Sequence, residues 1–386
     1  MPTDVAIIRG PYFRPNSTLL WEYVHNAYSD IDITGFESDP QWFDTSELNL
    51  PIESLHWWDG KTDAFGQENI VYHALEKYKL PSIALTGLRQ VVDEHDAVHV
   101  TENYRIYSYC VALLCAQTDT TFFVDAHENI PHRPANPLTW VVKKTVNRHA
   151  DGFTSPTLAS KRALIHEGVD PDLVEILPNV VNLDRFQPGP RDADAVSLPA
   201  KIESTFNILF VHGLNERKGI PFLLDAFETM QEDCDDISLL LLGENSFDRS
   251  YYNEHVRDNP AVYHFEYLED IQAAYNLSDV LVLPSVAAER WTEQFGRVLV
   301  EAMACGLPTV VTDVGGPPFV VEDEETGLVV EPRSSQSLAS ALTRLYRDEQ
   351  LLQELGSTAY DHVRDNYSPE TVGDDLYEFY RSHCDG

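Results

Sequence analysis

Basic residues are scarce in this chain. Its 386 residues include 27 Lys and Arg against 63 Asp and Glu, which gives a formal net charge of −36 at pH 7. Proteins that bind nucleic acids neutralise phosphates with clustered basic side chains. The sequence has no such basic patch, so its composition disfavours a nucleic-acid-binding function.

Cysteines and long apolar runs are also few. None of the five cysteines has the spacing of a metal ligand, which predicts reduced thiols in a reducing compartment. No stretch approaches the roughly 20 apolar residues that span a bilayer. Residues 1–4 lead straight into an apolar run, which argues against a signal peptide. We therefore expect a cytoplasmic protein, in contact with the inner membrane face at most peripherally.

The acidic residues are spread along the whole chain. Examples are Asp93-Glu94, Glu232-Asp233 and the run Glu322-Asp323-Glu324-Glu325. Such a surface repels itself in dilute buffer, whereas at molar salt the Debye length is about 3 Å and the repulsion is screened. This pattern predicts a salt-accumulating, extremely halophilic source. An acidic protein from a mesophile is the alternative.

Length and hydrophobic periodicity indicate an α/β protein of two domains. Apolar strands are expected at 5–8, 80–86, 97–100 and 121–126, with helices at 104–116, 140–150 and 157–167. The alternation restarts with strands at 207–212, 237–242, 262–265, 280–283 and 309–312. Strands that alternate with helices favour parallel sheets covered by helices on both faces.

The domain boundaries follow from a change of pattern. Residues 185–204 contain Pro188, Gly189 and Pro190 and show no apolar periodicity, so we predict a linker there. Residues 1–184 then form the N-terminal domain and residues 205–368 the C-terminal domain. Residues 369–386 form a separate final helix.

Two carboxylates eight positions apart mark the most informative segment. Glu293 lies in a loop after the predicted strand 280–283, and a helix is expected to begin near Gly296 and to stop at Gly306. The free N–H groups of a helix start bind anions. Glu301 lies about one and a half turns further along, where it can reach hydroxyls. A phosphate and a sugar hydroxyl together fit a nucleotide sugar.

The wider context of this pair carries a resemblance. The string Pro-Ser, Glu-x-Phe-Gly and Glu-Ala-Met-Ala-x-Gly-x-Pro over residues 284–308 resembles the retaining glycosyltransferases of family 4. The resemblance implies the GT-B fold, in which two Rossmann-like domains face a central cleft and the last helix crosses back to the N-terminal domain. A solvated loop glutamate before an ordinary amphipathic helix is the alternative.

The resemblance also implies a donor site in the C-terminal domain. Glu301 would bind the ribose hydroxyls, Lys218 and the backbone around Phe295 would hold the diphosphate, and Glu293 would face the donor sugar. Gly213 stands where the family commonly has arginine, so Arg217 or Arg297 is expected to supply that charge. The donor-binding candidates are Gly213, Arg217, Lys218, Gln294, Phe295, Gly296, Arg297 and Glu301.

On the N-terminal side, His127 ends a predicted strand and resembles the family's histidine that contacts the transferred sugar. His127 and Glu293 are the catalytic candidates. The acceptor-side candidates are Gly10, Arg14 and Glu102. Arg9 and Arg14 would bind an anionic acceptor, or would pair with nearby acids.

The sequence thus predicts an enzyme of the hexosyltransferase type. It would move a sugar from a nucleoside-diphosphate sugar to a sugar, lipid-linked or small-molecule acceptor, with retention of the anomeric configuration. We expect this reaction to serve the assembly of a lipid-linked or surface glycan. No metal or other cofactor is expected, because no metal-binding Asp-x-Asp motif is convincingly placed. The alternatives are a GT-B epimerase or phosphorylase and a catalytically silent donor-binding partner.

The charge pattern predicts stability that depends on salt. Raising KCl from dilute buffer to molar concentrations should raise the thermal unfolding midpoint, because the screened acidic surface repels itself less. Circular dichroism across a KCl series measures this midpoint. A midpoint that stays constant across the series would contradict a halophilic protein.

Overall fold

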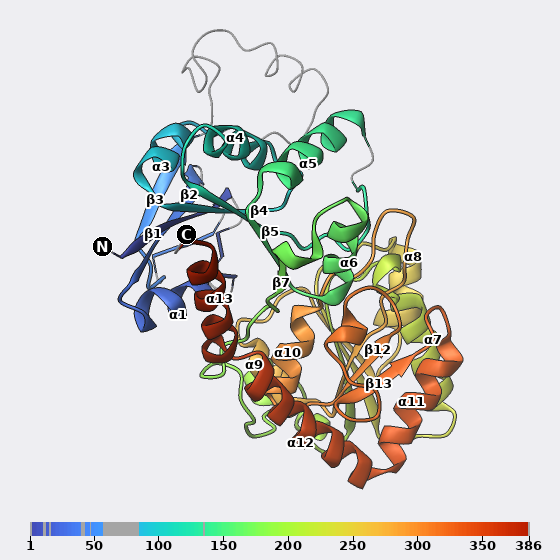
Figure 1. Cartoon of the computed structure of the whole chain (residues 1–386). Helices are drawn as coiled ribbons and strands as arrows, with labels where there is room; N and C mark the ends of the chain where they lie inside the picture. Colours follow the sequence, from blue (N-terminus) through green and yellow to red (C-terminus); the bar gives the residue numbers. More distant parts are fainter. Residues whose placement is uncertain are drawn as a thin grey trace. The chain divides into compact units, whose positions relative to one another are not determined.

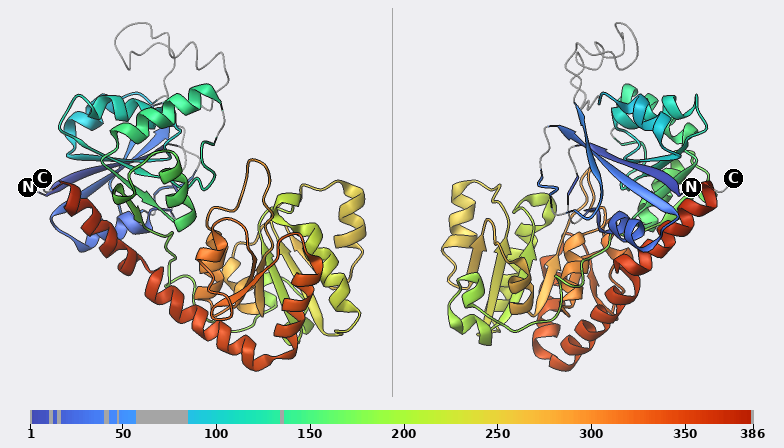
Figure 2. Two further views of the ribbon diagram at one scale, coloured as in Figure 1. Left: turned by 45° about the vertical axis from the view of Figure 1, so that its right-hand side comes forward. Right: turned by 90° about the vertical axis from the view of Figure 1, so that its left-hand side faces the viewer.

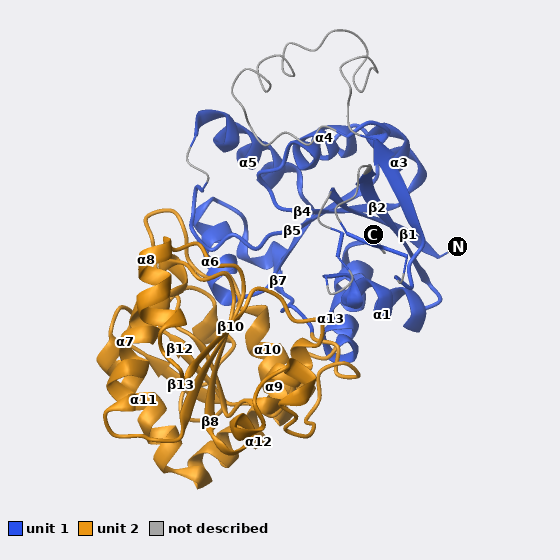
Figure 3. Cartoon of the chain, turned by 180° about the vertical axis from the view of Figure 1, so that it is seen from behind, with its two compact units in different colours: residues 1–180, 369–386 blue, residues 181–368 orange. Residues whose placement is uncertain are grey.

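The computed structural model describes residues 2–10, 13–14, 17–39, 43–46, 48–56, 85–133 and 136–384. The chain divides into two compact units (Figures 1 and 3). Unit 1 comprises Met1–Val180 with Pro369–Gly386, and unit 2 comprises Val181–Ser368. Each unit contains one parallel sheet with helices on either side (Figure 1), which confirms the predicted α/β class.

The sheet of unit 1 has the order β3-β2-β1-β4-β5-β6-β7, and every neighbouring pair is parallel. Strands of such a sheet are buried on both faces, which explains the unbroken apolar run at the centre of β1. The strands are β1 (Thr3–Gly10), β2 (Ile31–Asp39), β3 (Ile52–His56), β4 (Ala97–Thr101), β5 (Thr121–Asp125), β6 (Gly152–Ser155) and β7 (Val174–Ile176).

Helices cover both faces of this sheet. One face carries α3 (Leu88–Glu94), α4 (Ile106–Cys115) and α5 (Pro137–His149), and α6 (Leu158–His166) follows β6. The other face carries α1 (Leu19–Ala27) and α13 (Pro369–Cys384), which lie side by side (Figure 2). The C-terminal helix therefore returns to the N-terminal unit, as the predicted fold requires.

The sheet of unit 2 has the order β10-β9-β8-β11-β12-β13 and is also parallel. Its strands are β8 (Phe206–Val211), β9 (Ile237–Leu242), β10 (Val262–Phe265), β11 (Val280–Leu283), β12 (Thr309–Thr312) and β13 (Gly327–Val330). Its helices are α7 (Ile220–Gln231), α8 (Arg249–Tyr252), α9 (Ile271–Leu277), α10 (Arg297–Ala304), α11 (Ser335–Arg347) and α12 (Glu349–Asn366). Among the described residues, no helix is long and apolar enough to cross a membrane.

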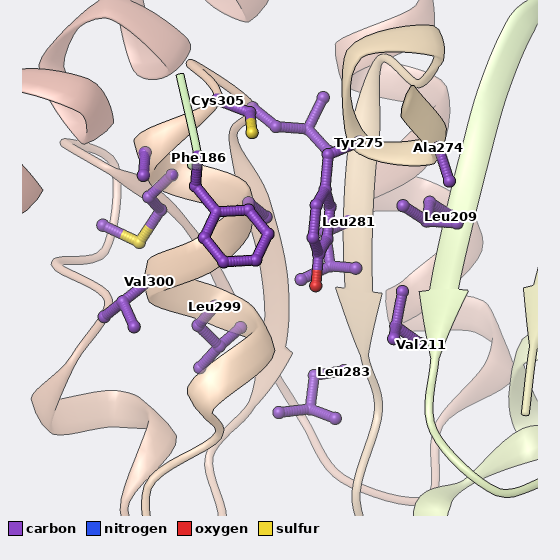
Figure 4. Packing of buried hydrophobic residues seen from close by; sticks show 14 of the residues in the cluster. Phe186, Leu209, Val211, Ala274, Tyr275, Leu281, Leu283, Leu299, Val300 and Cys305 are labelled. Carbon is purple, nitrogen blue, oxygen red and sulfur yellow. The ribbon is translucent and has the colours of Figure 1, made fainter. Parts of the chain in front are cut away.

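Residues 185–204, which we expected to form a linker, pack within unit 2. Their apolar side chains Phe186, Val196, Leu198 and Ile202 are buried in its core. Figure 4 shows Phe186 close to Tyr275, and the two rings meet edge to face with centroids 5.9 Å apart. The segment contains two short 3₁₀ helices, Asp194–Val196 and Ala200–Ser204, and its otherwise irregular backbone still directs apolar side chains into the core.

Some strands and helices of the structure were not predicted from the sequence. The strands β2 and β3 and the helix α3 were not expected, because acidic residues interrupt the apolar pattern of β2 and β3. The predicted strand at 80–86 falls largely on residues 80–84, which lie outside the described residues.

Candidate functional site

In unit 2, the candidate site lies where β8 and β11 end. These two strands are neighbours in the sheet although two other strands separate them in the sequence. α7 follows β8 and packs on one face of the sheet, while α10 follows β11 and packs on the other. Open α/β sheets bind ligands at such a switch point, beyond the carboxyl ends of the strands.

The loop after β8 is held close to the loop after β11. The Asn215 side chain accepts a hydrogen bond from the Lys218 N–H at 3.2 Å and donates one to the Gly213 carbonyl at 3.0 Å. Gly219 has φ of +74°, and a Cβ there would lie 1.8 Å from the Pro284 carbonyl oxygen. Only glycine allows this approach, which fixes Lys218 at the end of β11.

Buried Lys218 and half-buried Glu293 form an ion pair. Lys218 is 2% exposed, and its ammonium group donates to Glu293 Oε2, which also accepts from the Ser285 hydroxyl at 3.0 Å. Burial lowers the pKa of Lys218, and the Glu293 carboxylate opposes that shift. From the sequence we expected Lys218 to bind the diphosphate and Glu293 to face the donor sugar. The structure brings these two residues into contact. An incoming phosphate would compete with Glu293 for this ammonium.

His212 lies beside this pair. Burial and the charge of Lys218 lower the pKa of His212 to about 4, so its imidazole is neutral at pH 7. Its Nδ1 accepts a hydrogen bond from the Gly213 N–H at 2.8 Å. The histidine therefore adds no positive charge near Lys218.

The loop between Glu293 and α10 is clamped by the glycines that follow β12. The Gly316 N–H donates to the Glu293 carbonyl at 2.9 Å, and a Cβ on Gly316 would lie 1.8 Å from the Gln294 carbonyl oxygen. Gly296, with φ of +85°, begins α10, and Phe295 is buried with its ring 6.0 Å from that of Tyr367. Gln294, Gly296 and Arg297 are half-buried.

Glu301 lies in α10 and is 7% exposed. Its Oε2 accepts a hydrogen bond from the Tyr275 hydroxyl at 2.8 Å. Burial raises the pKa of Glu301, while Tyr275 and the charges of Arg297 and Arg185 oppose the shift. The sequence analysis missed Tyr275. It could have been found as a tyrosine within an apolar helix. A buried phenol hydroxyl needs a hydrogen-bond partner, so such a tyrosine points to a buried polar side chain nearby.

A cavity of about 670 Å³ opens beside the loop after β8. Its lining includes Asn215, Arg217, Phe222, Val286 and Arg333, and its volume lies in the range of small-molecule sites. The Arg217 guanidinium carbon lies 4.9 Å from the centre of the Trp291 ring, and Lys218 Nζ lies 4.8 Å from it. The Arg217 and Lys218 cations thus both lie over the Trp291 ring.

Gly213 has room for a side chain. A Cβ built there would have its nearest neighbours at 3.6 Å, the Asn215 amide nitrogen, and at 3.7 Å, the Glu244 carbonyl oxygen. Both are ordinary van der Waals distances. The absence of arginine at this position therefore does not follow from a steric limit of the backbone.

In unit 1, His127 follows β5 and contacts Asp125. Its Nε2 lies 2.9 Å from Asp125 Oδ2, and Asp125 also accepts hydrogen bonds from Arg9 and Thr154. Burial alone would lower the pKa of His127, but the Asp125 carboxylate outweighs burial and raises it. Burial alone would raise the pKa of Asp125, but His127 and Arg9 hold it well below its usual range.

Glu102 follows β4 and adopts an unusual conformation. It has φ of +68°, a strained value for a residue with a side chain, and it is 7% exposed. Its N–H donates to the Asp125 carbonyl at 2.8 Å, but its buried Oε2 has no hydrogen-bond partner among the described residues. Burial raises the pKa of Glu102. Strain combined with an unsatisfied buried oxygen favours a ligand-binding role.

The remaining acceptor-side candidates lie after β1. Gly10 ends the strand with φ of +59°, and the Arg14 guanidinium lies 4.3 Å from the centre of the Phe43 ring. Arg9, considered above as an anion ligand, is buried and lies 3.4 Å from Asp125 Oδ2. Arg9 therefore pairs with an acid of its own unit.

The ion pair gives a stability prediction. Lys218→Met and Glu293→Gln should each destabilise the protein by about 3–5 kcal/mol, because each leaves one buried charged group without its partner. The double variant should cost less than the sum of the two, since it leaves no unpaired charge. Urea unfolding followed by tryptophan fluorescence measures all three. Strictly additive effects would show that the two side chains are not coupled.

Both units match models of known protein families. Residues 199–362, within unit 2, match the family model described as glycosyl transferases group 1. Residues 29–180, within unit 1, match the model described as glycosyl transferase 4-like domain.

Several curated relatives are glycosyltransferases. A D-inositol 3-phosphate glycosyltransferase of Paenarthrobacter aurescens is 30% identical over 206 residues, which cover 51% of this chain and 49% of that protein. A phosphatidyl-myo-inositol mannosyltransferase of Mycobacterium leprae is 32% identical over 224 residues, which cover 56% and 55%. The chain thus spans about half the length of the curated relatives it matches.

Solved structures share the fold over nearly the whole chain. HepE of Anabaena, in complex with UDP, superposes with a TM-score of 0.77 at 19% identity and covers 98% of this chain and 100% of its own. Sucrose-phosphate synthase of Thermosynechococcus elongatus has a TM-score of 0.72 at 19% identity and covers 98% of both chains. Residues 29–180 therefore match a glycosyl transferase 4-like domain and residues 199–362 a glycosyl transferases group 1 domain, and the chain as a whole has the GT-B fold of these solved structures.

Proposed function

We propose that this protein transfers a glycosyl unit from a nucleoside-diphosphate sugar to a hydroxyl acceptor with retention of configuration. The observation that carries the proposal is the buried Lys218 ammonium at the switch point of unit 2, paired with Glu293 next to the start of α10. A buried cation beside a helix start suits a diphosphate. The relatives named as glycosyltransferases support the same reaction class.

The donor nucleotide would bind to unit 2. In this proposal Glu301 accepts hydrogen bonds from the ribose hydroxyls, and the Tyr275 hydroxyl holds its carboxylate in place. Lys218 and the backbone of Gln294–Arg297 bind the diphosphate, and Arg217 adds the charge that Gly213 lacks. Lys218 would then exchange part of its contact with Glu293 for phosphate oxygens, which leaves Glu293 able to accept from a donor-sugar hydroxyl.

Chemistry would depend on stabilising the leaving phosphate. As the sugar–phosphate bond breaks, negative charge grows on the phosphate, and a cation in a dry site stabilises it strongly. We infer that the acceptor attacks on the face from which the phosphate leaves, and that this phosphate takes the acceptor's proton. Glu293 accepts from the Ser285 hydroxyl and would keep part of its contact with Lys218, which makes it a weak nucleophile and supports this route.

In unit 1, His127 would accept or donate a hydrogen bond at the transferred sugar, and Glu102 would bind an acceptor hydroxyl. The unsatisfied Oε2 of Glu102 supports this assignment, because a hydroxyl would complete its hydrogen bonding. Gly10 and Arg14 would line the acceptor side.

The comparisons support a proposal for the donor and acceptor classes. UDP-glucose is the first donor to test, since HepE has been solved with UDP and with UDP-glucose. A lipid-linked or surface-glycan hydroxyl is the proposed acceptor. One relative is named a phosphatidyl-myo-inositol mannosyltransferase and another a capsular polysaccharide biosynthesis glycosyltransferase. Peripheral contact of the protein with the inner membrane face belongs to the same proposal.

The nucleotide assignment is tested at Glu301. Glu301→Gln should weaken UDP binding about 10- to 100-fold, because charged hydrogen bonds to ribose are worth about 1.5–3 kcal/mol. Calorimetry in high KCl measures the affinity. The exposed Glu232→Gln, in the loop between α7 and β9, is the matched control and should bind UDP like the parent protein. Parental affinity in a folded Glu301→Gln variant would overturn the assignment.

The proposed mechanism needs no metal ion, because Lys218 and Arg217 supply positive charge near the diphosphate. Transfer should therefore continue at the parental rate in EDTA, measured by release of UDP in the presence of acceptor. Loss of activity in EDTA and its return with Mg²⁺ would contradict this. As a control, donor incubated without acceptor should keep its sugar configuration. Conversion to another sugar would favour an epimerase.

A further inference from the structure

Unit 1 contains a buried chain of hydrogen bonds that leads from the C-terminal helix to His127. Its members come from different elements and are each at most 9% exposed: Trp21 of α1, Tyr380 of α13, His99 of β4, Thr154 of β6 and Asp125 of β5. None of them is a donor-binding candidate. This series of hydrogen-bonded side chains therefore needs an explanation apart from nucleotide binding.

The contacts follow one another without a gap. Trp21 Nε1 lies 3.1 Å from the Tyr380 hydroxyl, which lies 2.7 Å from His99 Nδ1. His99 Nε2 lies 3.4 Å from Thr154 Oγ1, and Thr154 Oγ1 lies 3.1 Å from Asp125 Oδ1. The other carboxylate oxygen of Asp125, Oδ2, is 2.9 Å from His127 Nε2.

Only one placement of the protons gives every hydrogen bond in this series a donor and an acceptor. A carboxylate only accepts, so Thr154 must use its single proton on Asp125. Thr154 then accepts from His99, which places the His99 proton on Nε2 and leaves Nδ1 to accept from Tyr380. The indole of Trp21 can only donate, and it donates to the Tyr380 oxygen. Each donor thus points toward Asp125.

The charge state of His99 agrees with this arrangement. Burial lowers the pKa of His99 to about 4, so the ring is neutral and carries a single proton. A protonated ring would carry protons on both nitrogens, and Nδ1 would no longer accept from Tyr380. The neutral ring is further enclosed by edge-on contacts with Trp21 and Tyr380, at centroid distances of 5.9 and 5.8 Å.

The chain fixes the orientation of Asp125. Thr154 holds Oδ1, while Arg9 and His127 approach Oδ2 at 3.4 and 2.9 Å. A carboxylate held at both oxygens cannot turn away from His127. The ring nitrogen that Asp125 engages is Nε2, so the neutral ring carries its proton there and keeps a lone pair on Nδ1.

We propose that Tyr380, His99 and Thr154 are positioning residues that hold Asp125, and through it keep His127 in the tautomer whose Nδ1 accepts a hydrogen bond from a substrate hydroxyl. This inference rests on the proposed glycosyl transfer. The C-terminal helix thereby takes part in the site of unit 1 through Tyr380, although this residue lies 281 positions from His99 in the sequence. The charged groups that face His127 are Asp125, Glu102 and Arg9.

Thr154 offers a matched pair of variants. Thr154→Val keeps the shape but removes the hydroxyl, whereas Thr154→Ser keeps the hydroxyl. Nitrogen-15 NMR of labelled histidines reports the tautomer of His127 above its pKa, with the His127→Asn variant to assign the signal. The parent protein and Thr154→Ser should show only the Nε2–H form. Thr154→Val should show a mixture with the Nδ1–H form.

Activity provides the second readout. Thr154→Val should lower kcat about tenfold with little change in the KM for the donor, which corresponds to one lost hydrogen bond of about 1.4 kcal/mol. Tyr380→Phe removes the hydroxyl that donates to His99. It should give the same mixture of His127 tautomers and the same fall in kcat. It serves as the second variant if Thr154→Val fails to fold.

The outcomes separate this inference from the proposed function. A folded Thr154→Val or Tyr380→Phe protein with a single His127 tautomer and parental kcat overturns the positioning role. A variant that only melts at lower temperature, with the tautomer unchanged, shows a purely structural role and overturns it too. A parent protein that shows the Nε2–H tautomer but transfers no sugar would instead overturn the proposed function, because the NMR readout needs no substrate.

Discussion

Parallel pairing of the strands is the constraint on which the rest of this structure depends. In both sheets the pairs are parallel, so the residues that follow the strands gather at one edge of each sheet. That edge receives Lys218 and Glu293 in unit 2 and Glu102 and His127 in unit 1. Residues that are 75 positions apart, as Lys218 and Glu293 are, become neighbours only through this pairing.

Buried charge organises both edges. Lys218 is compensated by Glu293, and Asp125 is compensated by Arg9 and His127, since an unpaired ion in a low-dielectric interior is costly. Glu102 departs from this pattern: it has a strained φ, and its buried Oε2 has no partner within the part of the chain that the structure describes. The compensated pairs explain how these charges are stabilised inside the fold, and the exception is the position that we propose for an acceptor hydroxyl.

Local patterns predicted much of the fold. The helix after Gly296, the strands at 237–242 and 309–312, and the return of the final helix were each readable from apolar periodicity, glycine stops or resemblance. The strands β2 and β3 were not, because acidic residues interrupt their apolar pattern. Residues 185–204 lack periodicity, yet Phe186, Val196, Leu198 and Ile202 are buried, since irregular backbone can still direct apolar side chains into a core.

The sequence by itself determined the α/β class, the acidic surface and the residue types at the candidate site, because these depend on composition and on short-range spacing. Only the tertiary structure decided which of those residues meet. It paired Lys218 with Glu293, placed Tyr275 on Glu301, and joined Tyr380 of the last helix to His99. Such contacts depend on sheet order and helix packing between distant segments, which no local pattern in a single sequence specifies.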